Sequence, residues 1–156
     1  MARQDVPVFI ECAINGETRP ERNPHVPCGP EAIVEDVLRC LDAGAALIHA
    51  HNGDIMQTGR AAADAYLAAW GPILAERPGT LWYPTLGVGS DMAESISHID
   101  LLAEECGLRL GLCDPGSTNV GAPDAEGLPV GMRRMVGQHI DLITDLRANS
   151  DIDALP

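Results

Sequence analysis

Short apolar runs alternate along the chain with longer stretches whose apolar residues recur every three or four positions. The short runs predict four β-strands, at residues 8–14, 45–49, 80–84 and 108–113. The longer stretches predict helices over residues 30–42, 60–75 and 91–106, and a further helical pattern covers residues 132–143. The strand starts are about 30–35 residues apart, which is the size of a βα unit. This order predicts an α/β fold in which helices cover a parallel sheet.

A glycine pair marks the turn before the third predicted helix. Gly87 and Gly89 flank Val88, and Asp91 with Glu94 three residues later forms a candidate capping box that opens the helix. A helix N-terminus of this kind can receive a phosphate, as in a small flavodoxin-like nucleotide binder. The glycines do not form a complete GxGxxG motif and follow the third strand instead of the first, so the pattern favours a tight turn over nucleotide binding.

The composition is typical of one acidic, water-soluble domain. The chain has 156 residues, of which 46% are hydrophobic and only 3% are aromatic. Acidic residues outnumber basic ones by 23 to 10, and the formal charge of −13 argues against a nucleic-acid or anionic-membrane partner. No apolar run approaches the roughly 18 residues of a membrane span, and the N-terminus has no secretory apolar region. We therefore expect a cytoplasmic protein.

The absence of lysine excludes several kinds of catalysis. All ten basic residues are Arg. Schiff-base aldolases, pyridoxal-phosphate enzymes and Walker-type nucleotide hydrolases all require a lysine. An electrophile in this chain would therefore be a metal, an arginine or backbone N–H groups. The five cysteines include no CxxC pair, which argues against a disulfide framework or a zinc ribbon.

Polar side chains follow the end of every predicted strand, and two histidines after the second strand are the sharpest feature. The carboxyl ends of parallel strands meet at one edge of a sheet, where sites collect. His49 and His51 are two positions apart, so in an extended segment their side chains point to the same side. Zinc binds neutral imidazole, and the pair therefore predicts a metal site. Two hydrogen-bonded histidines at a strand end without a metal are the alternative.

Residues after the first and fourth strands are candidate substrate contacts. Glu17 offers a carboxylate for proton transfer or for binding an amine or hydroxyl, and an exposed loop acid is its alternative interpretation. Gly116, Ser117 and Asn119 lie in a loop whose backbone and side-chain donors can meet a carboxylate or an oxyanion. The same residue types also suit an ordinary turn.

Taken together, these segments resemble the β-keto acid cleavage enzymes, the family that includes 3-keto-5-aminohexanoate cleavage enzyme. The matching stretches are AINGET at residues 13–18, NPHVP at 23–27, AGAALIHAH at 43–51, YPT at 83–85 and DPGSTN at 114–119. Their order and spacing cover residues from about 8 to 130, which is most of the chain. The combination of NPxxP with AGAxxxHxH is the specific part of the resemblance.

The resemblance implies a TIM-type (β/α)8 barrel that carries a divalent metal, usually zinc. It implies condensation of a β-keto acid with acetyl-CoA as co-substrate, and then cleavage into acetoacetate and a new CoA ester. His49 and His51 fall on the family's two metal-ligand histidines, and Glu17 falls at its acidic substrate-recognition position. Thr85 and Ser117 fall where the family places hydroxyl groups near the substrate. The loop that holds Gly116, Ser117 and Asn119 would bind the substrate carboxylate.

The resemblance covers the first half of such a barrel. Residues 1–130 correspond to about four βα units, and residues 131–156 form a helix and tail that do not match the family pattern. The family's third metal ligand, a Glu, and the Arg and Asp beside it have no matching position here. A complete barrel typically needs about 250 residues. We therefore expect a truncated enzyme that is inactive alone or depends on a partner chain.

A non-catalytic βα fragment that self-associates is the alternative function. An open half barrel leaves strand edges and an apolar face uncovered, and such surfaces favour self-association. We expect a homo-oligomer. The expected partners are otherwise small molecules, a β-keto acid and acetyl-CoA.

Overall fold

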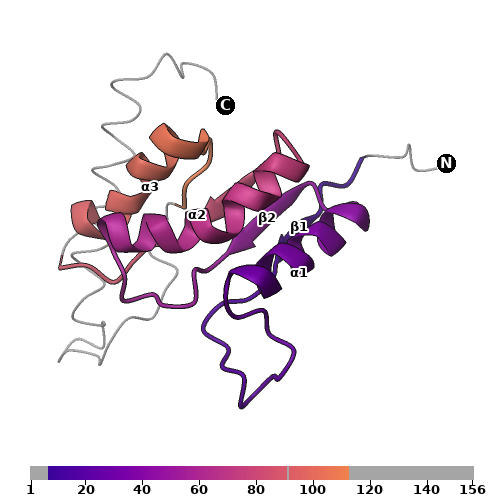
Figure 1. Cartoon of the computed structure of the whole chain (residues 1–156), viewed down its shortest axis with the longest axis horizontal. Coiled ribbons are helices and arrows are strands. Elements are labelled where there is room, and N and C mark those ends of the chain that lie inside the picture. Colours follow the sequence, from indigo (N-terminus) through magenta and orange to yellow (C-terminus); the bar gives the residue numbers. More distant parts are fainter. Residues whose placement is uncertain (1–6, 91, 113–156) are drawn as a thin grey trace, which may run out of the picture. The chain divides into compact units, whose positions relative to one another are not determined.

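The computed structural model describes residues 7–90 and 92–112 of the chain (Figure 1). In this part three strands alternate with three helices, in the order β1 (Glu11–Ala13), α1 (Pro30–Asp42), β2 (Leu47–Ala50), α2 (Gly59–Glu76), β3 (Trp82–Pro84) and α3 (Met92–Cys106). The strands form an open parallel sheet in the order β1-β2-β3. The predicted α/β class with parallel strands is therefore confirmed, whereas closure into a barrel stays a prediction.

The fourth predicted strand does not form over residues 108–112, the part of it that the structure describes. The backbone N–H of Leu108 donates to Leu102 O at the end of α3, and the Arg109 side chain donates to Gly79 O. A cavity of about 160 Å³ lined by residues 79–82 and 106–110 lies between this segment and the start of β3. The Leu108 N–H is engaged by the end of α3 and therefore does not take part in a ladder with β3. Residue 113, the loop 114–131 and the helical pattern 132–143 lie outside the described residues, as does Asp91 of the predicted capping box.

The first strand is shorter than its apolar run predicts. The ladder covers Glu11–Ala13, whereas Val8 and Phe9 are 83% and 63% exposed. In the described sheet β1 pairs only with β2, so residues beyond the ladder have no second neighbour to cover them.

Local sequence signals fix both ends of α1. Pro30 occupies the first helical position, where its missing N–H costs no hydrogen bond. At the other end Gly44 has a φ of 101°, its N–H donates to Leu41 O, and the N–H of Ala45 donates to Cys40 O. This is a Schellman motif, which needs a residue in the left-handed region after the helix.

The core lies between the sheet and the helices. Figure 1 shows α1 and α2 packed on the same side of the sheet. Side chains alternate along the strands, so Ile48 and Trp82 are buried under the helices while His49 and Tyr83 belong to the opposite face. Trp70 from α2 stacks on Trp82 with 3.9 Å between ring centres. The helix-facing side of the sheet therefore supplies stability, and its other face is left for polar residues.

Two further sequence expectations concern membranes and cysteines. Within the described residues, no helix combines the length and apolar character needed to cross a membrane. The described cysteines are all free thiols: Cys12, Cys28, Cys40 and Cys106.

Candidate metal centre

His49 and His51 lie side by side at the carboxyl end of β2. His49 belongs to the strand and His51 follows its last residue. Their ring centres are 5.2 Å apart and the ring planes are inclined by 76°. Two imidazoles on one tetrahedral zinc, each with a zinc–nitrogen distance of about 2.0–2.1 Å, place their ring centres roughly 5 Å apart. The spacing of the two rings therefore suits a shared metal ion.

Hydrogen bonds determine which nitrogen of each ring is available. The Nδ1 atom of His49 lies 3.3 Å from the carbonyl oxygen of Tyr83, which can only accept a hydrogen bond. The Nδ1 atom of His51 lies 3.2 Å from Oε1 of Glu17, and an ionised carboxylate also only accepts. Both Nδ1 atoms therefore carry the hydrogen, which leaves the Nε2 lone pair of each neutral ring for a metal. Histidines that bind metals are commonly held in this way through their other nitrogen.

The surroundings of His49 also favour its neutral form. Burial lowers the pKa of His49, the hydrogen bond to the Tyr83 carbonyl opposes that shift, and the nearby His51 adds to the lowering. Neutral imidazole is the form that binds metal ions. His49 is therefore ready to act as a ligand at neutral pH without first losing a proton.

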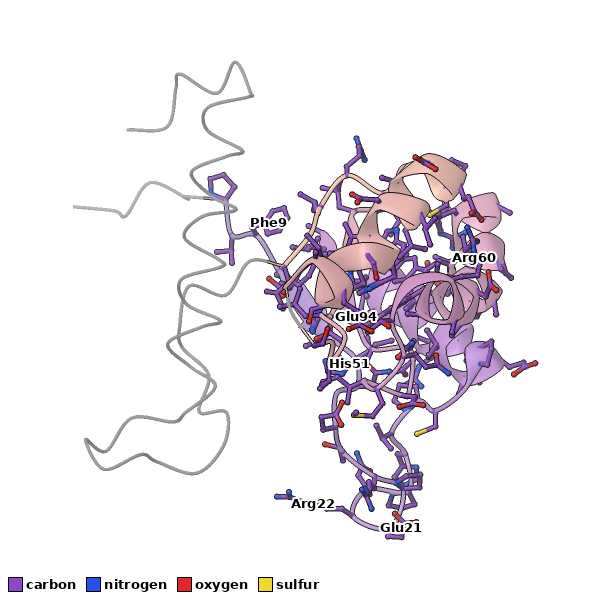
Figure 2. All side chains as sticks on the ribbon, turned by 90° about the vertical axis from the view of Figure 1, so that its left-hand side faces the viewer. Phe9, Glu21, Arg22, His51, Arg60 and Glu94 are labelled. Carbon is purple, nitrogen blue, oxygen red and sulfur yellow. The ribbon has the colours of Figure 1, made fainter. Side chains whose placement is uncertain are left out.

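Asn15 holds the backbone of His51 from both sides. Its Oδ1 accepts from His51 N over 2.7 Å, and its Nδ2 donates to His51 O over 3.0 Å and to Pro27 O over 3.3 Å. Asn15 follows β1 and Pro27 precedes α1, so one amide group ties the loop between these elements to the end of β2. Figure 2 labels His51 at the base of this loop and Glu21 at its tip.

Tyr83 connects all three strands across the face that carries the histidines. Its ring stacks on His49 with 4.5 Å between ring centres and an angle of 24° between planes. Its hydroxyl donates to the carboxylate of Glu11 on β1. Burial, followed by the bond to Glu11, raises the pKa of Tyr83 to about 12, so its hydroxyl stays protonated. The Tyr83 ring therefore packs against one face of the His49 imidazole.

Of the other predicted site residues, Thr85 is among the described residues, whereas those of the fourth strand end are not. Ala50 pairs with Pro84 at the last step of the register, so His51 and Thr85 each follow the end of one of two neighbouring strands. Thr85 follows Tyr83 by two positions, a spacing that in an extended segment puts both side chains on the same side. The predicted substrate contacts of the fourth strand end lie outside the described residues: Gly116, Ser117 and Asn119.

The two histidines have no third metal ligand within the described ranges 7–90 and 92–112. No group of three or more His, Cys, Asp or Glu side chains is arranged there to hold a metal ion. Glu17 contacts the Nδ1 side of His51, which makes it an orienting group in this arrangement. Catalytic zinc normally has three protein ligands, so a third ligand would have to come from beyond these ranges.

A hollow of about 610 Å³ adjoins Glu17 in the loop between β1 and α1. Its lining includes Arg19 and Arg22. These are the two described arginines for which the structure shows no ion pair or side-chain hydrogen bond, whereas the other four are bonded: Arg39, Arg60, Arg77 and Arg109. The hollow therefore offers two unengaged guanidinium groups in the loop that carries Glu17, with Glu17 and Glu21 also in its lining.

The glycine turn before α3 has no free N–H groups for a phosphate. The N–H of Gly87 donates to Ser95 O, that of Val88 to Ile55 O, and that of Gly89 to Ser95 Oγ. A Cβ on Gly87 would lie 2.6 Å from the carbonyl oxygen of Gln57. Close packing of the turn against the protein therefore explains its glycines, in agreement with the tight-turn interpretation.

Sequence reasoning missed the residues that hold the centre in place. Asn15, Tyr66, Tyr83 and His98 all make hydrogen bonds to strand ends or site residues. Asn15 carried a usable signal because it lies in the strand-end loop that also holds Glu17. The tyrosines and His98 carried none, because their partners lie 13 to 72 residues away along the chain.

Comparison with known proteins identifies one matching family. The profile of the family described as beta-keto acid cleavage enzyme matches residues 7–149. A comparison with curated proteins gives no match.

Proposed function

The chain belongs to the beta-keto acid cleavage enzyme family, and from this membership we propose that it condenses a β-keto acid with acetyl-CoA and cleaves the product. The acyl part of the keto acid ends on the CoA sulfur as a new CoA ester, and the acetyl group ends in acetoacetate. We propose that the catalytic centre lies at the carboxyl end of β2, with His49 and His51 as ligands of a divalent metal, in the first place zinc.

The fixed tautomers of the two histidines carry this proposal. Tyr83 O and Glu17 occupy the Nδ1 atoms, so both Nε2 atoms are available on rings 5.2 Å apart. His49 and His51 would hold the metal, which when bound would supply the Lewis acid for the keto oxygen in a chain that has no lysine to polarise it. The donor set and the spacing of the rings thus support the metal that the family implies.

The remaining groups of the centre have roles that follow from their contacts. Glu17 keeps the Nδ1 proton on His51, and because 65% of its side chain is exposed it can also reach a bound substrate. We propose that Thr85 donates a hydrogen bond to the substrate, together with Gly116, Ser117 and Asn119 of the loop 114–131. Arg19 and Arg22 line the adjoining hollow and suit the substrate's anionic groups.

The family fold completes this proposal. In a (β/α)8 barrel the face of the sheet that carries His49 and Tyr83 would line the interior, and the site would open at the carboxyl ends of the strands. The third metal ligand would come from residues beyond the described ranges or from a second chain. The proposal is tested by assay of the whole chain with zinc, acetyl-CoA and a panel of β-keto acids.

The assay detects acetoacetate and the new CoA ester by mass spectrometry. Unlike the expectation of a truncated chain that is inactive alone, the proposal predicts product from the wild type and from the control H25A, whose histidine lies in an exposed part of the loop before α1. We expect a loss of about 100-fold or more in H51A, because the metal would lose a ligand. Absence of product from every keto acid, or equal rates in H51A and H25A, would contradict the proposal.

Self-association is a second candidate function that one observation favours. Val8, Phe9 and Ile10 are exposed and precede β1, whose outer edge is unpaired in the described sheet. Apolar residues beside an open edge favour pairing with another chain. Light scattering tests this proposal: a dimer or larger oligomer that dissociates in F9D supports it, and a monomeric wild type contradicts it.

A further inference from the structure

Two helices hold the backbone of Thr85 through their side chains. β3 ends at Pro84, so Thr85 lies just beyond the ladder. Its N–H donates to the hydroxyl of Tyr66 over 3.1 Å, and its carbonyl oxygen lies 2.9 Å from Nε2 of His98. Tyr66 belongs to α2 and His98 to α3. Both polar backbone groups of Thr85 are therefore fixed from outside the sheet.

The same tyrosine hydroxyl also reaches the end of β2. Tyr66 donates its hydroxyl hydrogen to the carbonyl oxygen of Ala50 over 3.2 Å. Ala50 lies between His49 and His51, so one hydroxyl joins the strand end with the histidines to Thr85. Tyr66 is 2% exposed, and burial raises its pKa, which keeps the hydroxyl protonated and able to donate.

The hydrogen bond to Thr85 explains why a histidine occupies this buried position, which an apolar side chain would fill at a lower cost. Its side chain is 1% exposed and stacks on Tyr66 with 5.7 Å between ring centres. The carbonyl of Thr85 only accepts, so Nε2 carries the hydrogen and Nδ1 is left as an acceptor. That Nδ1 atom is buried with no hydrogen-bond partner among the described residues, and a buried polar atom without a partner costs stability. An apolar residue would avoid this cost but could not bond to Thr85.

We propose that Tyr66 and His98 are positioning residues that set the hydroxyl of Thr85 relative to the histidine pair. The proposal rests on the proposed function for its catalytic consequence, but the positioning itself is a property of the fold. Neither side chain reaches the face of the sheet that carries His49, so both act through the backbone they hold.

Four variants separate positioning from general stability. Y66F removes the hydroxyl and keeps the ring, and H98L removes the donor and keeps the bulk. H98Q keeps an N–H donor near the position of Nε2. I73V shortens a buried side chain on α2 that makes no bond to a strand end, and so is the matched control.

The first readout needs no catalysis. Hydrogen exchange of the peptide that contains Thr85 is expected to be about tenfold or more faster in Y66F than in I73V, because the amide loses its acceptor. H98Q is expected to exchange like the wild type. Equal exchange in Y66F and I73V would overturn the proposal whether or not the chain turns substrate over.

The second readout is the turnover itself. We expect kcat to fall about tenfold or more in Y66F and H98L with KM within about twofold of the wild type, and to recover in H98Q. In a T85V background the further loss caused by Y66F should shrink to about threefold or less, because the positioned hydroxyl is already gone. A loss of the same size in both backgrounds would overturn the positioning role, and a wild type without turnover would count against the proposed function alone.

Discussion

The carboxylate of Glu17 accepts a hydrogen bond from Nδ1 of His51 over 3.2 Å, although 34 positions separate the two residues in the chain. The bond joins the loop after β1 to the end of β2. It fixes the imidazole in the form whose Nε2 can bind a metal. In the proposed function, Glu17 would orient a metal ligand and leave its second oxygen for the substrate.

Replacing Glu17 should weaken metal binding without removing it. E17A leaves Nδ1 of His51 without its acceptor, so we expect zinc affinity to fall about 10-fold or more. Competition with a coloured chelator measures the change. The matched control is E21A, which removes an acid from the tip of the same loop (Figure 2). Equal zinc affinity in E17A and E21A would show that Glu17 does not orient the ligand.

Asn15 should matter for both stability and metal binding. N15A removes the acceptor for His51 N and the donor to His51 O, and we expect the free energy of unfolding to fall by about 1–3 kcal/mol. Urea denaturation measures this change. N23A removes a comparable but exposed bond to the backbone of His25 and should change stability by less than about 0.5 kcal/mol. Similar losses in the two variants would contradict the role assigned to Asn15.

His98 should make the fold sensitive to acid. Burial lowers the pKa of His98 in the folded state, whereas the unfolded chain titrates near the ordinary value of about 6.5. The unfolded state therefore binds a proton first as the pH falls, and stability that is complete above about pH 6.5 decreases below it, by at most about 1.4 kcal/mol per pH unit for one proton.

Urea midpoints at pH 7.5 and pH 5.5 measure this dependence. We expect the wild type to lose more stability between these two pH values than H98Q, which has no imidazole to protonate. The same loss in both proteins would assign the acid sensitivity to other groups, His49 first among them, since its pKa is also lowered by burial.

Arg19 and Arg22 should contribute to substrate binding. Their guanidinium groups line the hollow beside Glu17 and have no partner among the described residues. Because charge-assisted bonds to anions are strong, R19Q and R22Q should raise KM for the keto acid or for acetyl-CoA about tenfold, with kcat little changed. R39Q, which loses only a surface pair with Asp36, is the control. KM values equal to that of R39Q for both substrates would exclude the hollow as a binding site.

Regular elements and the juxtaposition of the two histidines could be predicted because their signals are local. Pro30 and Gly44 bracket α1 within the sequence itself, and His49 with His51 shows the two-residue spacing of a strand. The strand predicted over residues 108–113 was wrong in its described part for the opposite reason. Its apolar residues indicate burial, but whether they pair depends on how the segment packs beside β3, which no local pattern contains.

The support around the centre could not be predicted because it depends on long-range contacts. Nothing near Tyr66 in sequence indicates that its hydroxyl bonds to Ala50 and Thr85. His98 is equally plain in the sequence, where it is one of several polar residues of a helix. The position of such side chains follows from how α2 and α3 pack on the sheet, and only the structure shows it.

Zinc titration of the whole chain by calorimetry tests the central claim most directly, because that claim is that His49 and His51 bind one metal through Nε2. We expect one zinc per chain in the wild type and in H25A, and a loss of affinity of about 10-fold or more in H49A and in H51A alike. Circular dichroism checks that each variant stays folded. Zinc bound with unchanged affinity by either H49A or H51A, or no zinc bound by the wild type, would contradict the account.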